Sequence, residues 1–130
     1  MNKTIVVVGA SRGIGKSVVE LFASNPANKI VALARDKERL VSNFKHFPNV
    51  NCQTFDLSSS ITSQLTEIFS EIENVDILIN NAGFLVNKPF ETLTHEDFLQ
   101  SYQVNVIGVM ETVQYFVSKM NPKKSHILNI

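Results

Sequence analysis

Short apolar runs alternate along this chain with longer segments in which apolar residues recur at helical spacing. Five runs, rich in Val and Ile, predict β-strands. They cover residues 4–9, 29–34, 50–55, 75–80 and 126–130. The first run has no alternation of apolar and polar positions, which is typical of a strand buried on both faces of a parallel sheet. The third run is more polar, so we expect that strand to be more exposed.

Four segments between these runs predict helices. They run from Ile14 to the break at Pro26, over 36–47, over 58–73, and from Thr94 through Met120. The residues expected to face the core are Val18, Val19, Leu21, Phe22 and Ala23 in the first helix, Leu40, Val41 and Phe44 in the second, and Ile61, Leu65, Ile68, Phe69 and Ile72 in the third. Asp36 is placed as an N-cap, and Thr94 with Asp97 matches the capping-box pattern.

The order of these elements predicts a single α/β domain over residues 1–130, a length that suits one hydrophobic core. Strands that alternate with helices through short connections favour an open, doubly wound, Rossmann-like parallel sheet with helices on both faces. In such sheets ligands bind outside the carboxyl ends of the strands, where the strand order reverses. We therefore look for a site in the segments that follow the strands.

A glycine-rich segment, VGASRGIG at 8–15, follows the first predicted strand and opens the first predicted helix. The spacing of Gly9, Gly13 and Gly15 is G-x-x-x-G-x-G, which differs from the common dinucleotide fingerprint and from the P-loop. Residues without side chains let backbone N–H groups approach a pyrophosphate at a helix N-terminus. The same glycines could instead serve only a tight strand-to-helix turn, and the spacing alone does not decide between the two interpretations.

Three further motifs accompany this loop. DL at 56–57 follows the third strand, NNAG at 80–83 follows the fourth, and VNVIG at 104–108 lies in the long helix. Together with VGASRGIG, in which Val8 replaces a threonine, this set resembles the short-chain dehydrogenase/reductase family. The motifs occur in the family's order, and the resemblance extends over all 130 residues.

The resemblance implies an oxidoreductase that transfers a hydride between a nicotinamide cofactor and a ketone or aldehyde. It also implies which residues surround the cofactor. Gly9, Ser11, Arg12, Gly13, Ile14 and Gly15 would hold the pyrophosphate and nearby ribose, Asp56 and Leu57 the adenine, and Asn81, Ala82 and Gly83 the central cleft. Asn105 matches the family's active-site asparagine.

The end of the second strand bears on the choice between NADP and NAD. Enzymes that use NAD tend to carry a carboxylate there, whereas enzymes that use NADP carry a basic residue for the 2′-phosphate. This chain has Ala34 followed by Arg35, and Arg12 lies at the same corner. Two guanidinium groups favour NADP over NAD. Arg35 could also be a solvated residue at a helix end, and Asp36 only an N-cap.

The family's proton donor is a tyrosine whose pKa is lowered by a lysine four residues later, and a serine after the fifth strand holds the carbonyl. The sequence ends at Ile130, immediately before the place of that serine. YFVSK at 115–119 matches the Tyr–Lys spacing but precedes the fifth strand, so we interpret the match as coincidence, with Tyr115 packed and Lys119 solvated. The 130 residues alone are expected to bind the cofactor without catalysis.

The fifth predicted strand would be an unpaired apolar edge, which predicts association. The chain would then be a fragment, a truncated gene product, or a chain completed by a partner or by another copy, as in a homo-oligomer. The rival hypothesis is a non-catalytic nucleotide-binding or protein-interaction module.

Composition narrows the class of protein further. Twelve basic and twelve acidic residues leave no net charge to attract nucleic acid or an anionic membrane, and no apolar run has the length of a bilayer span. A single cysteine, Cys52, cannot form an internal disulfide, which favours the cytoplasm. Cys52 and the phenylalanines are expected in the core. His46, His95 and His126 are far apart and are expected to be solvated or capping residues rather than metal ligands.

Overall fold

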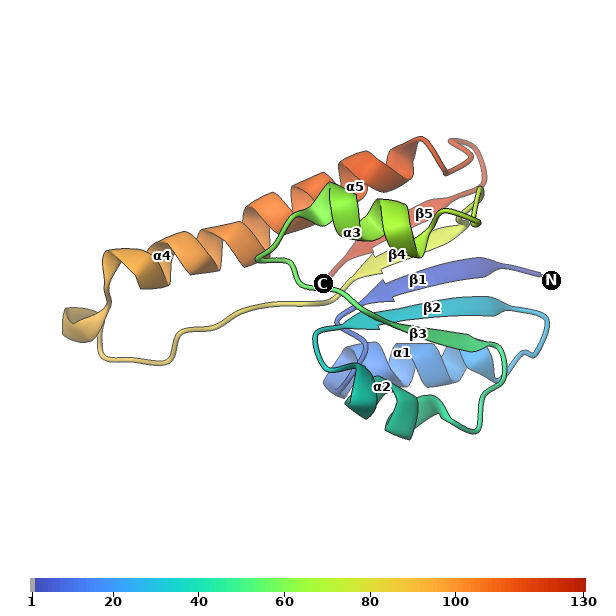
Figure 1. Ribbon diagram of the computed structural model, residues 1–130, viewed down its shortest axis with the longest axis horizontal. Helices are drawn as coiled ribbons and strands as arrows, with labels where there is room; N and C mark the ends of the chain where they lie inside the picture. Colours follow the sequence, from blue (N-terminus) through green and yellow to red (C-terminus); the bar gives the residue numbers. More distant parts are fainter. Residues whose placement is uncertain (1) are drawn as a thin grey trace.

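The computed structural model describes residues 2–130 and contains a five-stranded parallel sheet (Figure 1). Along the chain the elements are β1 (Thr4–Val8), α1 (Gly13–Ala23), β2 (Lys29–Ala34), α2 (Lys37–Phe44), β3 (Val50–Thr54), α3 (Ile61–Ile68), β4 (Ile77–Asn80), the 3₁₀ turn η1 (Phe90–Thr92), α4 (His95–Tyr102), the π-helical turn η2 (Gln103–Ile107), α5 (Gly108–Val117) and β5 (His126–Asn129). The strand order is β3-β2-β1-β4-β5, so the direction of winding reverses between β1 and β4. The predicted doubly wound α/β fold is confirmed.

Helices cover both faces of the sheet, with α1 and α2 on one side and α3 and α5 on the other (Figure 1). The side chains of β1 alternate between two cores. Ile5 and Val7 pack in the core that α1 and α2 cover, whereas Val6 and Val8 pack in the core that α3 and α5 cover. This double burial explains why the run has no polar alternation, and each such side chain contributes about 1.5–3 kcal/mol to folding.

The long helix predicted from Thr94 through Met120 is instead two α-helices joined by a π-helical turn, and it ends at Val117. Its start is as predicted, because the Asp97 backbone N–H donates to Thr94 Oγ1 at 3.1 Å and the Thr94 N–H donates to Asp97 Oδ2 at 2.9 Å. The π turn contains the VNVI part of the VNVIG motif. Such turns add a residue to the helix and often occur at functional sites.

Several predicted core residues are exposed. In α1 the buried positions are Gly15, Val19 and Ala23, and Leu21 lies about 200° around the helix from Val19. In α2 only Leu40 and Phe44 are buried, so the prediction for Val41 is also wrong. Helical spacing was correct there, but the buried face is narrower than the apolar pattern.

Other exposed apolar residues belong to an extension of the molecule. The segment from β4 to α4 reaches away from the sheet (Figure 1). Phe90 and Phe98 lie on it and are exposed, which corrects the prediction that all phenylalanines are in the core. Cys52, on β3, is half-buried rather than buried. Burial depends on which layer covers a residue, and a local apolar pattern does not carry that information.

Strand β5 pairs with β4 in parallel, and among residues 2–130 it has no other strand partner. Its four residues are exposed, with Ile127 at 41% and Leu128 at 52% of their accessible surface. Leu128 lies in register with Ile79, whose side chain packs in the core under α1 and α2. The apolar edge predicted for this segment is present.

No helix within residues 2–130 has both the length and the apolar character required to cross a bilayer.

Candidate functional site

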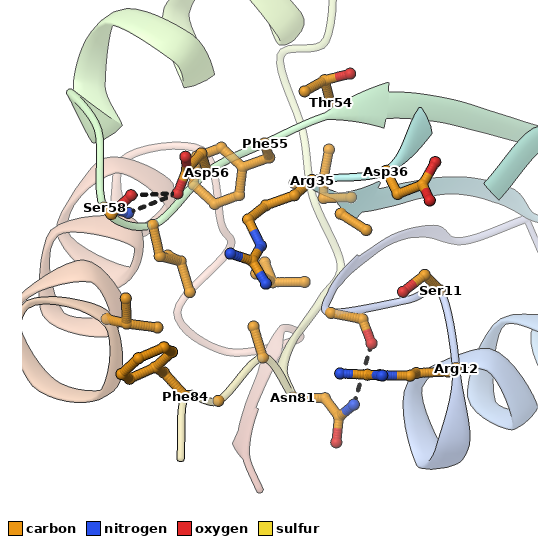
Figure 2. A pocket seen from close by; sticks show the side chains of 18 of the residues that line it. Ser11, Arg12, Arg35, Asp36, Thr54, Phe55, Asp56, Ser58, Asn81 and Phe84 are labelled. Atoms are coloured by element: carbon orange, nitrogen blue, oxygen red, sulfur yellow. Dashed lines mark hydrogen bonds between the residues drawn. The ribbon is translucent and has the colours of Figure 1, made fainter. Parts of the chain in front are cut away.

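A cleft of about 880 Å³ opens at the carboxyl ends of the strands. Its walls come from the segments after β1, β2, β3 and β4, together with Gln100 of α4 and Val104 of the π turn. Figure 2 shows Arg35 reaching into this cleft, with Asp56 and Ser58 on one side of it and Ser11, Arg12 and Asn81 on the other. The cleft therefore lies where a parallel α/β sheet is expected to bind a ligand.

The glycine segment is shaped both by contacts within the protein and by open space. Gly9 has φ +81°, and a Cβ there would lie 2.5 Å from the Ala82 nitrogen. A Cβ on Gly15 would overlap the Gly9 carbonyl and lie 2.7 Å from Asn81 Nδ2. Gly13 has φ +58°, yet a Cβ there would meet nothing within 4 Å. Gly9 and Gly15 are thus required by packing, whereas Gly13 leaves the first turn of α1 open to a ligand.

Two asparagine side chains hold the backbone of this segment. Asn81 Nδ2 donates to the Gly9 carbonyl at 3.1 Å, and Asn43 Nδ2 donates to the Ser11 carbonyl at 2.7 Å. The backbone N–H groups of Gly9 and Ala10 both donate to the Leu33 carbonyl, at 2.9 and 3.1 Å. The loop is therefore fixed to β2, to α2 and to the end of β4 before any ligand binds.

Two more side-chain amides hold the other cleft segments. Gln64 accepts from the Asp56 N–H at 2.8 Å and donates to the Asp56 carbonyl at 2.9 Å. Asn105 accepts from the Phe84 N–H and donates to the Phe84 carbonyl, both at 2.8 Å. Each amide satisfies a donor and an acceptor of one residue, as a neighbouring strand would. The segments after β3 and β4 are thereby held on α3 and on the π turn.

Asp56 is one of three acidic residues that line the cleft, with Asp36 and Glu38. Its Oδ1 accepts from the Ser58 hydroxyl at 2.6 Å and from the Ser58 N–H at 2.9 Å. The hydrogen bond from the Ser58 side chain is the main reason that the pKa of Asp56 lies below its ordinary value; partial burial opposes this, and Arg35 lowers the pKa further. Asp56 is therefore ionised at neutral pH.

The basic side chains of the cleft are Arg12, Arg35, Lys37 and Arg39. Arg35 follows the last residue of β2 and is exposed. Asp36, the next residue, is the N-cap of α2, because its Oδ1 accepts from the Arg39 N–H at 3.0 Å. The predicted capping role of Asp36 is confirmed. The resulting surface suits a phosphate group.

Tyr115 and Lys119 lie away from the cleft, on α5 and just after it, and both contact the segment of α3 and its C-terminal turn. The Tyr115 hydroxyl donates to the Leu65 carbonyl at 3.1 Å, and Lys119 Nζ donates to the Ile72 carbonyl at 2.8 Å. The predicted packing of Tyr115 is confirmed, and burial raises the pKa of its hydroxyl. The prediction that Lys119 is only solvated is wrong, because its ammonium group satisfies a backbone carbonyl.

Most of the residues assigned to the cofactor lie together. Those that line the cleft are Gly9, Ser11, Arg12, Arg35, Asp56, Leu57, Asn81, Ala82 and Gly83. Gly13, Ile14 and Gly15 form the adjoining first turn of α1, and Asn105 is hydrogen-bonded to the backbone of Phe84. Sequence reasoning missed Asn43 and Gln64, whose only signal is an amide on a helix beside a strand end. His46, His95 and His126 are exposed, and residues 2–130 contain no cluster of His, Cys, Asp or Glu that could hold a metal ion.

Comparison with known proteins identifies the family. The family model described as short chain dehydrogenase matches residues 3–130. The chain belongs to the short-chain dehydrogenase family. In this short-chain dehydrogenase the glycine segment, the DL and NNAG motifs and the π turn all border one cleft. The predicted resemblance is confirmed.

Individual relatives extend well beyond the matched region. An uncharacterized oxidoreductase of Bacillus subtilis, YvrD, is 33% identical over 132 residues, which are 98% of this chain and 50% of YvrD. The 3-amino-tetrahydro-pyrrolizinone reductase of Xenorhabdus hominickii is 32% identical over 132 residues, covering 98% of this chain and 45% of that enzyme. The structure of an alcohol dehydrogenase from the archaeon Thermococcus sibiricus, complexed with 5-hydroxy-NADP, superposes with a TM-score of 0.80 at 27% identity, covering 90% of this chain and 52% of that one. The chain spans about half the length of these relatives.

Proposed function

We propose that this short-chain dehydrogenase binds NADP and serves hydride transfer between NADPH and a ketone or aldehyde. The observation that carries the proposal is the pair Arg12 and Arg35, which border the cleft at the ends of β1 and β2. The last residue of β2 is Ala34, at the position where enzymes that use NAD tend to carry a carboxylate for the ribose 2′-hydroxyl. NAD is the less favoured cofactor.

The remaining cleft residues suit the other parts of a dinucleotide. The open surface at Gly13 and the first turn of α1 would receive the pyrophosphate, together with Gly9, Ser11, Ile14 and Gly15. Asp56 and Leu57 would contact the adenine, and the segment Asn81–Gly83 the central part of the cofactor. When bound, the cofactor supplies or accepts the hydride, and the residues of this chain bind and orient it.

The relatives support the proposed carbonyl substrate class. One is a reductase, and another is an alcohol dehydrogenase complexed with an NADP derivative. We assign Asn105 to the active-site region because it positions Phe84, which lines the cleft. Tyr115 and Lys119 donate to carbonyls of the α3 segment, so they do not serve as the proton donor. We therefore expect residues 1–130 alone to bind cofactor without turnover.

Association and location are part of the same proposal. The edge of β5 has no further strand partner among residues 2–130, and Ile127 and Leu128 expose apolar side chains on opposite faces of it, so we propose that a second copy covers this edge in a homo-oligomer. Cys52, the single cysteine, suits a reducing cytoplasm.

A titration of the purified protein with NADPH and with NADH tests the cofactor assignment, alongside a carbonyl-reduction assay. In Arg35→Ala we expect the Kd for NADPH to rise about 10-fold to 100-fold, because a charge-assisted hydrogen bond contributes about 1.5–3 kcal/mol. The Kd for NADH should change by less than about twofold, since NADH lacks the 2′-phosphate. Lys29→Ala, which removes an exposed cation at the opposite end of β2, is the matched control. Equal losses for both cofactors would reject the NADP assignment.

A further inference from the structure

The Ser11 carbonyl in the glycine segment is bound by a side chain from a different layer of the fold. Asn43 lies on α2, between Leu40 and the buried Phe44, and its Nδ2 donates to Ser11 across 32 residues of sequence at 2.7 Å. Asn43 is half-buried and belongs to none of the family motifs. Its bond is the shortest of those that side-chain amides make to the cleft segments.

The effect of this bond follows from the planarity of the peptide group. In a trans peptide the C=O and N–H groups point in opposite directions. The peptide between Gly9 and Ala10 shows this, because its carbonyl accepts from Asn81 while its N–H donates to Leu33 on β2. Asn43 likewise holds the carbonyl of the peptide between Ser11 and Arg12 toward α2. The N–H of that peptide, which belongs to Arg12, therefore faces away from α2.

Arg12 is the N-cap residue of α1, with φ −158° and ψ 170°, and its side chain makes no cap hydrogen bond. The direction in which Arg12 leaves the backbone is consequently set by the peptide that Asn43 holds. Arg35 immediately precedes the N-cap residue of α2, the helix that carries Asn43. Arg12 and Arg35 are thus connected through one short helix.

We infer that Asn43 is a positioning residue of the cofactor site, which orients Arg12 toward the phosphate carried by the adenosine ribose of NADP. This inference rests on the proposed function. Asn43 itself does not line the cleft, so it acts through Arg12 and contributes no direct contact. Its removal weakens binding of the dinucleotide that carries the extra phosphate more than binding of the one that lacks it.

A double-mutant cycle between Asn43 and Arg12 tests this inference, with the Kd for NADPH as the readout. We expect Asn43→Ala to raise the Kd for NADPH about fivefold in the wild-type protein and less than about twofold in Arg12→Ala, because the two residues act as one unit. The Kd for NADH should change by less than about twofold in Asn43→Ala. Asn43→Gln keeps the amide donor and should restore most of the affinity for NADPH.

Asn49→Ala is the matched control. Asn49 Nδ2 donates at 3.1 Å to the carbonyls of Ala23, Asn25 and Asn28, beside the amino ends of the strands. Its loss should lower the melting temperature without changing either Kd. Alanine has a higher helix propensity than asparagine, so Asn43→Ala should fold. Asn43→Leu provides a second variant, with a side chain of similar volume and no hydrogen-bond donor.

The outcomes separate the two proposals. If the wild-type protein binds neither dinucleotide, the proposed function fails and this inference fails with it. If the wild-type protein binds NADPH and the Asn43 variants bind it equally well, or if the Asn43 and Arg12 effects simply multiply, Asn43 is not a positioning residue and the proposed function stands.

Discussion

Strands β1 and β5 are both short and apolar and belong to the same parallel sheet, yet their surroundings differ completely. Residues Ile5 to Val8 of β1 are at most 2% exposed, whereas Leu128 of β5 is 52% exposed. β1 lies between β2 and β4 and is covered on both faces, whereas β5 lies at the edge. The position of a strand in the sheet, rather than its apolar content, decides what it contributes.

The same contrast applies to the ends of these strands. The segment after β1 is held by β2, by Asn43 and by Asn81, and a neighbouring backbone lies against Gly9. The end of β5 is connected to the sheet through β4, by the Ile130 N–H on the Asn80 carbonyl and by Asn80 Nδ2 on Asn129 Oδ1. The strand end that several neighbouring elements hold, that of β1, is therefore the one that borders the cleft.

Matched leucine truncations give the largest expected difference between the two regions. Leu33 on β2 is fully buried, and Leu33→Ala should lower the free energy of unfolding by about 2–5 kcal/mol, since it removes transfer free energy and leaves a cavity. Leu128→Ala on β5 should lower it by less than about 0.5 kcal/mol at dilutions where the protein is monomeric and this edge is uncovered. Denaturant unfolding measures both. Similar losses would show that the edge of β5 is covered in solution.

Two glycine substitutions in the segment after β1 separate the cost of a steric clash from the cost of a left-handed backbone. Gly9→Ala should destabilise the fold by about 3 kcal/mol, because it combines a left-handed residue with a clash against Ala82. Gly13→Ala should cost only about 1–2 kcal/mol, the penalty for a left-handed alanine in open space. Thermal unfolding compares the two variants. Equal costs would contradict the packing role assigned to Gly9.

Tyr115→Phe tests the region between α3 and α5, outside the cleft. The variant loses the hydrogen bond from the hydroxyl to the Leu65 carbonyl, so the free energy of unfolding should fall by about 0.5–1.5 kcal/mol. The Kd for NADPH should stay unchanged, as measured by fluorescence titration. If the wild-type protein did reduce a carbonyl and Tyr115→Phe abolished this with folding and cofactor binding intact, Tyr115 would instead have a catalytic role.

The smallest effect is expected for the carboxylate Asp56, and it depends on pH. Hydrogen bonds from Ser58 hold the pKa of Asp56 below its ordinary value, and those from Thr94 and Lys88 lower the pKa of Asp97 in the same way. A carboxyl group with a lowered folded pKa stabilises the fold above its unfolded pKa, and this stabilisation is lost as the pH falls through the folded value. Asp56→Asn should therefore lower the melting temperature at neutral pH. The loss in free energy of unfolding should be less than about 1 kcal/mol, because solvent screens the site.

Melting curves recorded between about pH 6 and pH 2 should show the wild-type and Asp56→Asn temperatures converging as the pH falls. Asp97→Asn, on the extended segment, should show the same direction. If the difference in melting temperature between wild type and Asp56→Asn persists at the lowest pH, Asp56 stabilises the fold through packing rather than through its charge.

The sequence supports the order of elements and most of the cleft, because strand ends follow directly from apolar runs. It is harder to predict which face of a helix is buried and which residues far apart in the sequence come into contact. Leu21 and Val41 have the right spacing but lie off the narrow buried stripe, and Phe98 lies where no second layer covers the helix. Asn43 could not be assigned, since its partner is 32 residues away and a half-exposed amide on a helix gives no local signal.

The contact between Gly9 and the Ala82 backbone also constrains the order of folding. The Asn81 amide that holds Gly9 comes from 72 residues further along the chain, so the loop has this support only after β4 has paired with β1. Closing so long a loop is entropically costly before its contacts form. During synthesis, a nascent chain whose NNAG segment has not yet emerged from the ribosome should fail to bind nucleotide. Affinity for the cofactor should appear once β4 has emerged and paired. Binding by chains truncated before Asp76 would contradict this order.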